Sequence, residues 1–327
     1  MIRILLLFLT FFSVYANVEE ECNKIKNVDV IDVETLGKLA KLSVPDLEGT
    51  HKGQSGRIGV IGGSVEYTGA PFFSAITSLK MGADLVYVIT TDEAAPIIKS
   101  FSPDLIVHPF LEQRYMDKIN NLLTKMNLVI IGPGLGTSNH TVQLATEIIK
   151  SCKELHIPLV IDADGLYAVS KNPHVLKNYL RPGVILTPNF KELDRLKTDI
   201  GVDTTARLIE YWGPYINILA KGQIDTFTSF HKYYDWSGSF GGSGRRAGGQ
   251  GDILAGMLGT FFNWALRMNL CNNVSSDNLA ASVASFVAAK MTRICNEESF
   301  KTHGRSMLAS DMLQNIHPAF KKVLGSS

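Results

Sequence analysis

Residues 241–257 read GGSGRRAGGQGDILAGM, a glycine-rich loop that runs into an apolar helical pattern starting at about Asp252. Six glycines between residues 241 and 252 let the backbone adopt positive φ angles and come close to a ligand. The first amide groups of a helix are unpaired, and together with the helix dipole they form a binding site for anions. Arg245 and Arg246 lie in the same loop, and guanidinium groups can hold phosphate oxygens. This stretch therefore predicts a phosphate site at the start of a buried helix.

Asp252 is the informative residue of this stretch, because an ionised carboxylate beside a phosphate site repels the phosphate. We expect the helix dipole to lower the pKa of Asp252 and to keep the side chain ionised. Its simplest role is to accept a proton from a hydroxyl that attacks the phosphate. The alternative is that Asp252 is only the N-cap of the helix and that the glycines form only a flexible loop.

The composition is that of a globular protein with a sizeable core. The chain has 327 residues, of which 45% are hydrophobic and 19% are charged. A formal net charge of +1 gives no reason to expect a nucleic-acid partner. The four cysteines, at positions 22, 152, 271 and 295, form no CxxC pair, which argues against a zinc or redox motif. They are also too sparse for a disulfide scaffold.

The N-terminal segment has the pattern of a secretory signal peptide over residues 1–16, with Arg3, a short apolar run and Ala16 at a suitable cleavage position. The run is too short to span a bilayer, so we expect no stable membrane span. A mitochondrial presequence is the alternative, although it should carry more Arg and Ser. Asn139 and Asn273 begin glycosylation triplets that matter only on the secretory route. Residues 17–44 are expected to form a lead-in with a helix over 32–42, and residues 45–327 the catalytic domain.

Short apolar runs alternate with helical patterns along this domain. Such runs predict strands that are covered on both faces, and therefore a mostly parallel sheet with helices on both sides. Later residues predict two antiparallel strands and then buried helices. The expected strands are 57–61, 85–90, 105–107, 128–131, 159–161, 184–186, 216–220, 226–230 and 232–236, and the expected helices include 70–81, 252–268, 279–295 and 311–324.

Glycines or polar residues follow four of the expected parallel strands, at residues 62–64, 132–136, 162–165 and 187–192. Ligands bind beyond the carboxyl ends of parallel strands, so these segments predict one edge lined for a ligand. Within them, Asn189 and Glu192 have the spacing of a capping box. Alternatively, Glu192 holds Mg²⁺ through water, because magnesium needs only one or two carboxylates. Asp164 is either a carboxylate that supports a bound magnesium without being its direct ligand or a turn residue.

Two further positive side chains could contact ligands. Arg195, one helical turn beyond Glu192, can pair with a substrate phosphate. Lys221 ends the strand 216–220 and either closes a turn or contacts a nucleotide. Several common motifs are missing: the sequence contains no GxxxxGK[ST], no GxGxxG and no GxSxG, and its histidines show no metal-site spacing. A Walker-type site, a common nicotinamide dehydrogenase and a serine hydrolase are therefore disfavoured.

Seven segments together resemble one family: HKGQSGRIGVIGG at 51–63, EYTGAP at 66–71, IGPGLG at 131–136, IDADGL at 161–166, LTPN at 186–189, AGGQGD at 247–252 and HGRS at 303–306. They are similar to the ATP-dependent (S)-NAD(P)H-hydrate dehydratases of the eukaryotic carbohydrate-kinase-domain type. The resemblance covers roughly residues 45–320. It implies an α/β fold, a ribokinase-like three-layer sandwich with a mostly parallel central sheet and helices on both faces.

The resemblance also implies an activity. Such a lyase acts on the S epimer of 6-hydroxy-tetrahydro-NAD(P), phosphorylates the ring hydroxyl with ATP and Mg²⁺, and eliminates phosphate to restore NAD(P)H. Asp252 matches the superfamily's base, and residues 248–251 match its anion hole. The family's substrate contacts match Gly69, Gly134, Asn189, Phe190, Lys191, Glu192, Leu193, Asp194, Arg195 and Asp252. Its ATP contacts match Lys221, Gly222, Gln223, Ile224, Asp225, Gly242, Ser243, Gly244, Arg245, Arg246, Ala247, Gly248, Gly249, Gln250 and Gly251.

Two other functions fit the same glycine-rich loop. One is a kinase of a small sugar or vitamin alcohol that keeps its phosphorylated product, and the other is a nucleotide-binding module without catalysis. The segments at 66–71 and 132–136 favour the dehydratase, and the intact Asp252, Arg245 and Glu192 argue against an inactive module. The choice between NADH and NADPH hydrates and the formation of a homo-oligomer stay open. The compartment also stays open, since the resemblance implies the mitochondrion or the cytoplasm and the N-terminal segment predicts the secretory route.

Overall fold

The computed structural model describes residue 22, residues 30–272 and residues 276–325. The expected signal peptide at 1–16 and the triplet at Asn273 lie outside the described residues. The described chain forms a nine-stranded sheet in the order β3-β2-β1-β4-β5-β6-β7-β8-β9. The strands are β1 (Arg57–Ile61), β2 (Leu85–Ile89), β3 (Ile106–His108), β4 (Leu128–Ile131), β5 (Leu159–Ile161), β6 (Val184–Leu186), β7 (Ile216–Ala220), β8 (Asp225–Thr228) and β9 (Trp236–Gly238).

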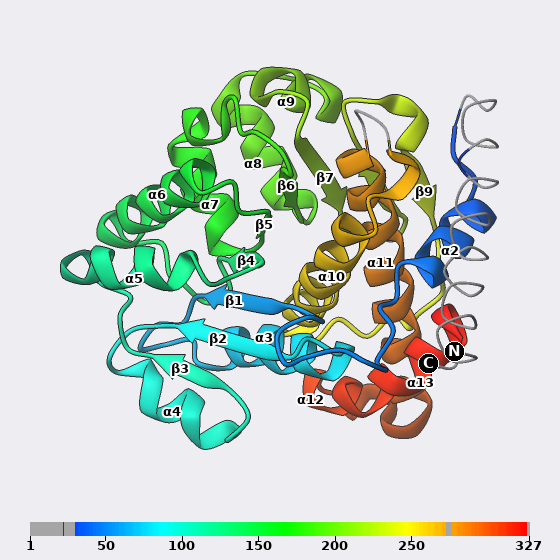
Figure 1. Cartoon of the computed structure of the whole chain (residues 1–327), viewed down its shortest axis with the longest axis horizontal. Helices are drawn as coiled ribbons and strands as arrows, with labels where there is room; N and C mark the ends of the chain where they lie inside the picture. Colours follow the sequence, from blue (N-terminus) through cyan, green and yellow to red (C-terminus); the bar gives the residue numbers. More distant parts are fainter. Residues whose placement is uncertain (1–21, 23–29, 273–275, 326–327) are drawn as a thin grey trace, which may run out of the picture.

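The first seven strands are parallel, and β8 and β9 extend the sheet as antiparallel strands. Helices cover both faces, which confirms the predicted three-layer arrangement (Figure 1). The longer helices are α2 (Val33–Leu42), α3 (Gly69–Met81), α4 (Ala94–Phe101), α5 (Met116–Leu123), α6 (Asn139–Glu154), α7 (Asp164–Lys171), α8 (Phe190–Ile200), α9 (Thr205–Trp212), α10 (Gln250–Arg267), α11 (Ser276–His303) and α13 (Ile316–Leu324), with the short α12 (Ala309–Met312) before the last.

Two hydrophobic cores explain why the strands read as continuous apolar runs. On β4, Ile130 joins the core formed with α2, α3, α4, α10, α11 and α13, whereas its neighbours Val129 and Ile131 join the core formed with α5 to α9. Successive side chains of a strand point to opposite faces, so a strand covered on both sides needs apolar residues at every position. Ile130 and Ile131 are both fully buried.

Small residues on α10 allow it to approach α3 closely. Gly256 shows this best: a Cβ at this position would lie 2.4 Å from the carbonyl oxygen of Ser74 on α3. The hydroxyl of Ser78, one turn further along α3, also donates to the carbonyl of Gly256 over 3.2 Å. This close packing holds the first turns of α3 and α10 beside each other at the edge of the sheet.

Two of the predicted elements differ in kind from the structure, and the helix expected over 279–295 is longer, from Ser276 to His303. Residues 232–236 do not form a strand: Lys232–Tyr234 is a 3₁₀ turn and β9 begins at Trp236. The turn is closed by Asp235, whose carboxylate accepts from the backbone N–H of Ser229 at 2.7 Å. The predicted helix 311–324 is divided into α12, a 3₁₀ turn and α13. Pro318 lies in the first turn of α13, where a missing N–H is tolerated, but it could not continue a helix from residue 311.

A disulfide joins Cys22 to Cys271, which are 249 positions apart in the sequence, and brings their α-carbons to 5.3 Å. Cys271 lies in the connection between α10 and α11, so the bond ties the N-terminal region to the end of α10. The cysteine spacing alone does not predict this pair. The other two cysteines, Cys152 and Cys295, are free and buried.

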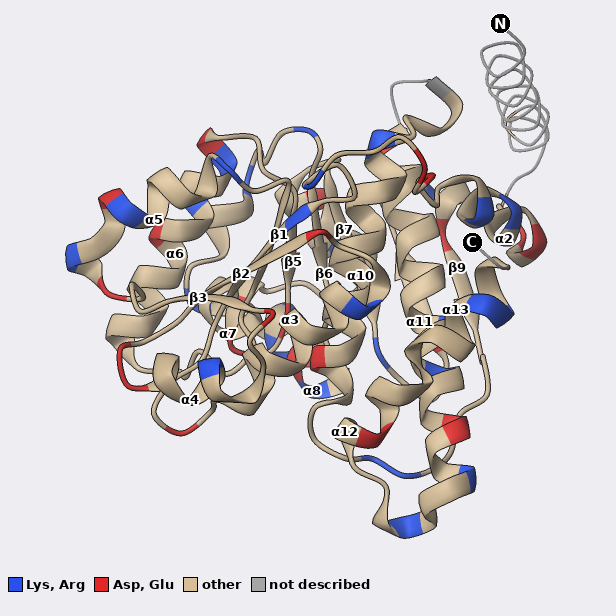
Figure 2. Cartoon of the chain, turned by 60° about the horizontal axis from the view of Figure 1, so that its bottom comes forward, with Lys and Arg blue, Asp and Glu red and all other residues tan. Residues whose placement is uncertain are grey.

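Charged residues of both signs are interspersed over the helices on both faces (Figure 2), in agreement with the small net charge. Among the helices that the structure describes, none is both long and apolar enough to cross a bilayer.

Candidate active site

Adjacent strand ends are tied together at the edge where the sequence predicts a ligand. The ends of β1, β4, β5, β6 and β7 follow one another in the sheet. At least one hydrogen bond links each pair of neighbouring segments, so the strand ends are held together along this edge. The bonds run from Gly63 N to Pro133 O at 2.9 Å, from Gly136 N to Asp164 Oδ2 at 2.8 Å, from Thr187 Oγ1 to Asp162 Oδ1 at 2.7 Å and from Lys221 N to Pro188 O at 2.8 Å.

The glycine-rich loop leads into α10, and its last glycine, Gly251, lies beside Lys221 and Asp162 at this edge. Gly249, with φ of 91°, is the N-cap of α10, and within the described chain no side chain caps that helix. Its left-handed backbone suits glycine, and a Cβ there would lie 2.7 Å from the Cβ of Ala309. The first amides of α10 therefore lack a side-chain partner within the described chain, and the anion site at this helix start stays a prediction. Asp252 is the third residue of α10, so the interpretation of Asp252 as the N-cap is wrong.

Asn296 of α11 holds the loop in place. Its side-chain oxygen accepts from the backbone N–H of Ser243 at 2.6 Å and from the Ser243 hydroxyl at 2.8 Å. Its amide nitrogen donates to the carbonyl of Arg245 and to the side chain of Gln250, both at 3.3 Å. Only 3% of Asn296 is exposed, so these bonds are protected from water.

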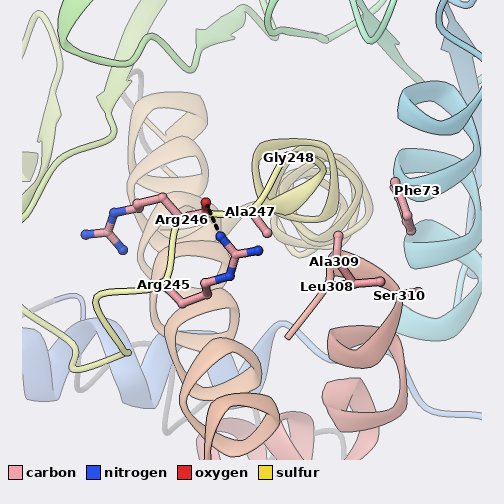
Figure 3. A pocket seen from close by; sticks show the side chains of 8 residues that line it. All are labelled: Phe73, Arg245, Arg246, Ala247, Gly248, Leu308, Ala309 and Ser310. Carbon is pink, nitrogen blue, oxygen red and sulfur yellow. Dashed lines mark hydrogen bonds between the residues drawn. The ribbon is translucent and has the colours of Figure 1, made fainter. Parts of the chain in front are cut away.

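Two pockets flank the loop. The first, which we call the α12 pocket, has a volume of about 400 Å³ and is lined by Phe73, Arg245, Arg246, Ala247, Gly248, Leu308, Ala309 and Ser310 (Figure 3). The second, the α11 pocket, has a volume of about 370 Å³. It is lined by Asn189, Lys221, Gly222, Gln223, Asp225, Arg246, Gln250, Gly251, Leu254, Ala289, Thr292, Arg293 and Asn296.

The α11 pocket unites the two segments predicted to bind ATP, since residues from 221–225 and from 246–251 both line it. Arg293 of α11 shapes the first of these segments: its guanidinium donates to Asp225 at 2.8 and 3.1 Å and to the carbonyl of Gly222. Asp225 also accepts from the N–H of Gly222 at 3.0 Å and is 2% exposed. The Gly222 N–H and the Arg293 guanidinium thus satisfy the carboxylate of Asp225. This carboxylate fixes the shape of the loop and presents no free charge to the pocket.

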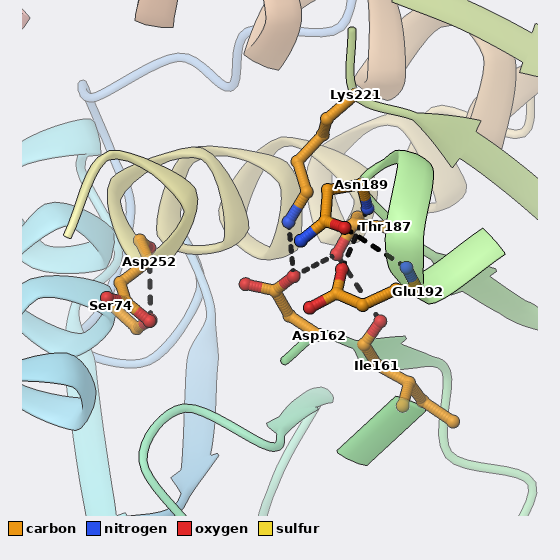
Figure 4. A network of polar contacts seen from close by, with 8 residues as sticks. All are labelled: Ser74, Ile161, Asp162, Thr187, Asn189, Glu192, Lys221 and Asp252. Atoms are coloured by element: carbon orange, nitrogen blue, oxygen red, sulfur yellow. Dashed lines mark hydrogen bonds and ion pairs between the residues drawn. The ribbon is translucent and has the colours of Figure 1, made fainter. Parts of the chain in front are cut away.

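A charged cluster lies at the junction of the strand ends and α10 (Figure 4). The ammonium of Lys221 donates to Oδ1 of Asp162 at 2.6 Å, and the Thr187 hydroxyl donates to the same oxygen. Burial would lower the pKa of Lys221, but the carboxylates of Asp162 and Glu192 outweigh this effect and raise it. Lys221 is therefore a firmly protonated cation, held where a polyanion could reach it.

Asp252 lies beside this cluster, and its main-chain oxygen accepts from the Ser74 hydroxyl of α3 at 3.0 Å (Figure 4). Burial raises the pKa of Asp252 to about 7, the nearby Asp162 and Asp164 contribute to the rise, and Lys221 opposes them. The expectation that the helix dipole lowers this pKa is wrong, because desolvation and two carboxylates dominate. A pKa near neutrality suits a group that must take up a proton during turnover.

Asn189 and Glu192 form the predicted capping box at the start of α8. Glu192 N donates to Asn189 Oδ1 at 3.1 Å, and Asn189 N donates to Glu192 Oε2 at 2.7 Å. Burial raises the pKa of Glu192, and Lys221 opposes that rise. Lys221 also forms a parallel β-bridge with Asn189, so the start of α8 and the end of β7 form one wall of the site.

The other residues predicted from the family pattern are spread around this centre. Gly69 begins α3, and Gly134 packs against Tyr67 and Ala70 beside it. In α8, Phe190 is 79% exposed and Leu193 packs into the core with α6 and α7.

The remaining positions on α8 and in the two loops are mostly exposed. Arg195 stacks on Tyr167, with its guanidinium carbon 5.1 Å from the ring centre. The exposed residues among these positions are Lys191, Asp194, Gly222, Gln223, Ile224, Gly244, Arg246 and Gly248. Gly242 packs against Arg293 and Asn296, which places it on the α11 side of the loop.

Arg293 and Asn296 build the site but are not predicted from the sequence, and Asp162 is predicted only as part of the edge segment 162–165, without a role of its own. Asp162 is the first residue after β5. A carboxylate directly after a buried parallel strand is the signal in the sequence that indicates a role in the site. Arg293 and Asn296 lie three residues apart in a helix that is otherwise largely apolar in its middle. A polar pair of this spacing on a buried helix indicates that one face meets polar groups.

The layered fold, with its mostly parallel sheet between helices, is ribokinase-like. A ribokinase-like superfamily protein from Enterococcus faecalis superposes with a TM-score of 0.72 at 21% identity, covering 89% of this chain and 95% of that one. A Bacillus subtilis ADP/ATP-dependent NAD(P)H-hydrate dehydratase, co-crystallised with ATP and Mg²⁺, superposes with a TM-score of 0.64 at 20% identity, covering 91% and 99%. At these identities the likeness shows the fold alone.

Sequence comparison shows the family. The family model described as NAD(P)H-hydrate dehydratase matches residues 58–318. An ATP-dependent (S)-NAD(P)H-hydrate dehydratase of Aedes aegypti is 45% identical over 286 residues, covering 87% of this chain and 83% of the relative. Its counterpart in Danio rerio is 43% identical over 298 residues, covering 88% of each chain. This chain belongs to the NAD(P)H-hydrate dehydratase family.

Proposed function

We propose that this protein uses ATP to dehydrate the S epimer of 6-hydroxy-tetrahydro-NAD(P) and thereby restores NAD(P)H. The observation that carries the proposal is Asp252, a carboxylate with a pKa near 7 on the first turn of an uncapped helix. A phosphate bound at the free amides of this turn would lie next to a base, which phosphoryl transfer to a hydroxyl requires.

The first step is transfer of the terminal phosphoryl group of ATP to the ring hydroxyl. Asp252 takes the hydroxyl proton while the hydroxyl oxygen bonds to phosphorus, and ADP leaves. The amides of residues 249–251, Lys221 and Arg246 offset the charge that develops on the phosphoryl oxygens. The α11 pocket holds the rest of the nucleotide, between the loop 222–225 and α11.

The second step is elimination. The lone pair of the ring nitrogen expels phosphate from the adjacent carbon. The neighbouring carbon then loses a proton to the released phosphate, and the double bond reforms. Hydroxide is a poor leaving group and phosphate is a good one, so the first step makes the second possible. Gly69 and Gly134, beside the first turn of α3, are the proposed contacts of the nicotinamide end of the substrate.

Magnesium fits this arrangement through Glu192. One oxygen of its carboxylate accepts the Asn189 N–H, and magnesium can be held by one or two carboxylates through its own water molecules. A cation there would also relieve the repulsion between Glu192 and Asp162. When bound, Mg²⁺ supplies positive charge to the phosphate oxygens of ATP.

The test is incubation of the purified protein with ATP, Mg²⁺ and a mixture of hydrated NADH epimers. The absorbance of the reduced nicotinamide ring should return for the S epimer, with one phosphate freed for each ring restored. A stable phosphate ester that accumulates without return of absorbance would instead indicate a kinase of the same fold.

We also propose that residues 1–16 are a targeting segment for the secretory route, residues 17–44 the lead-in and residues 45–327 the catalytic domain. The disulfide between Cys22 and Cys271 supports an oxidising compartment, because such bonds rarely persist in the cytosol. N-terminal sequencing of the mature protein from its native cell tests the assignment. A start near residue 17 is expected, and a chain that retains its first sixteen residues would contradict it.

A further inference from the structure

Arg245 and Arg246 are adjacent in the glycine-rich loop, but the two side chains leave it on opposite sides. Figure 3 shows the guanidinium of Arg245 directed toward Leu308 and Ala309, and that of Arg246 directed away from them. The lining of the α11 pocket agrees, since it includes Arg246 and not Arg245. Both residues line the α12 pocket, where Arg245 contributes the side chain that faces Leu308.

The main chain of Arg245 is held firmly. Its carbonyl accepts from Asn296 Nδ2 at 3.3 Å and from Gln250 Nε2 at 3.1 Å, and its N–H donates to the Ser243 hydroxyl at 3.2 Å. The carbonyl is thereby held by α11 and α10, and the N–H by Ser243 within the loop. The direction of the Arg245 side chain is therefore set by the anchored loop.

The two guanidinium groups also differ in the hydrogen-bond partners that the protein offers them. One terminal nitrogen of Arg246 donates to the carbonyl of Ser243, and one of Arg245 donates to the carbonyl of Arg246, both at 3.2 Å. Nε of Arg245 is buried and has no hydrogen-bond partner within the described chain. A buried, unpaired donor on a cationic group is costly unless a ligand supplies an acceptor. Nε itself is enclosed by protein atoms, and the partly exposed remainder of the Arg245 side chain lines the α12 pocket, where a ligand could supply an acceptor to the guanidinium.

The α12 pocket adjoins the first turn of α10. Gly248 is one of its lining residues, and the next residue, Gly249, packs against Phe73 and Ala309 of the same pocket. Phe73 lies one turn from Gly69 on α3, and Ser74 bonds to the main chain of Asp252. A ligand with its reacting ring near Gly69 and Asp252 could therefore extend past Phe73 to Arg245.

We infer that the two arginines serve different ligands: Arg246 binds the phosphates of ATP in the α11 pocket, and Arg245 binds a phosphate group of the dinucleotide substrate in the α12 pocket. The inference rests on the proposed function. The chemistry fits, since a dinucleotide carries a pyrophosphate, and its NADP form a further phosphate, while Phe73 and Leu308 offer apolar surface beside the cation.

The matched variants Arg245→Gln and Arg246→Gln test the inference in the full-length protein. The Michaelis constants are measured for ATP and, separately, for hydrated NADH and hydrated NADPH. Arg245→Gln should raise KM for the hydrated dinucleotide by about tenfold or more, because it removes a charge-assisted bond, and should leave KM for ATP within about twofold. Arg246→Gln should raise KM for ATP by about tenfold or more and leave KM for the hydrated dinucleotides within about twofold.

The two dinucleotides identify which phosphate is bound. Contact with the pyrophosphate predicts equal effects of Arg245→Gln on both hydrates, and contact with the additional ribose phosphate predicts an effect on the NADPH hydrate alone. The inference is overturned if Arg245→Gln raises KM for ATP as much as Arg246→Gln does, or if it leaves both dinucleotides unaffected.

Binding separates this inference from the proposed reaction. NADPH affinity is measured by fluorescence titration in the presence of ADP, and ATP affinity by calorimetry. Arg245→Gln should weaken NADPH binding and Arg246→Gln should weaken ATP binding, even if no turnover is detected. Absence of turnover by the wild type would refute the proposed function alone. Equal loss of NADPH binding by both variants would refute the division of roles. Arg245→Lys should retain part of the NADPH affinity, and unchanged thermal unfolding shows that the variants are folded.

Discussion

The ammonium of Lys221 lies 2.6 Å from Oδ1 of Asp162, and this buried ion pair faces the carboxylate of Asp252. The two members of the pair act on Asp252 in opposite directions: Asp162 raises its pKa and Lys221 lowers it. Burial adds a larger rise, and the sum is a pKa of about 7. The ionisation of the proposed base therefore depends on charges contributed by two strand ends.

The pH dependence of turnover tests this relationship. Asp252 must be deprotonated to accept a proton, so kcat/KM should fall as the pH decreases through about 7. Lys221→Met removes the charge that lowers the pKa and should move the midpoint upward by about one pH unit, and Asp162→Asn should move it downward. Lys322→Met, at an exposed position on α13 and outside the predicted site, is the control. One common midpoint for all four proteins would contradict this account.

Replacement of the base separates activity from stability. Asp252→Asn should reduce kcat by about 10²–10⁴-fold, the usual contribution of a general base. A loss of only about threefold would contradict the assigned role. The pKa of about 7 in the folded protein lies above the ordinary value of 3.8, so ionisation of Asp252 destabilises the folded protein progressively as the pH rises from 3.8 to about 7.

The same variant should therefore unfold at a higher temperature than the wild type at a pH above the folded-state pKa of about 7, and at the same temperature at a pH below 3.8. Thermal unfolding on both sides of this window measures the difference. A variant that is less stable on the alkaline side would show that the carboxylate is stabilised by partners in the folded state.

Much of the fold can be predicted from the sequence because each parallel strand is buried on both faces. The apolar runs at 57–61 and 128–131 coincide with β1 and β4. Side chains of both strands pack into the hydrophobic cores on the two faces of the sheet. Glycines and polar residues then mark the strand ends. The turn at Lys232–Tyr234 is missed because its alternating aromatic residues imitate a strand, while Asp235 closes a turn that periodicity cannot reveal.

The site is predicted only in part, for a different reason. The position of Asp252 follows from the glycine-rich loop, but its pKa depends on burial and on Asp162, which comes from the end of β5, far earlier in the chain. Likewise, Asn296 contacts the loop only because α11 packs beside α10. Four cysteines allow three pairings as two disulfides, and the observed single bond is set by the fold.

Asn296 is a positioning residue for the glycine-rich loop. Asn296→Ala removes four hydrogen bonds and leaves the N–H of Ser243 without its partner, so KM for ATP should rise by about tenfold. Asn296→Asp keeps the acceptor and loses the donor, and its KM should be intermediate. Lys301→Ala, an exposed change on the same helix, should behave like the wild type. A merely structural role would lower the thermal stability of both Asn296 variants and leave KM for ATP unchanged.

The disulfide between Cys22 and Cys271 should contribute to the stability of the whole domain, because it closes a loop of 249 residues in the unfolded chain. Cys22→Ser should lower Tm by about 5–10 °C, given the usual 2–4 kcal/mol for such a bond. Cys271→Ser should have the same effect, and the double variant should be no less stable than either, because both changes remove one bond. A reducing agent should lower Tm of the wild type and leave the double variant unchanged, since Cys152 and Cys295 are free thiols. Additive effects of the two substitutions would show that the cysteines act separately and that the bond is not formed in the native protein.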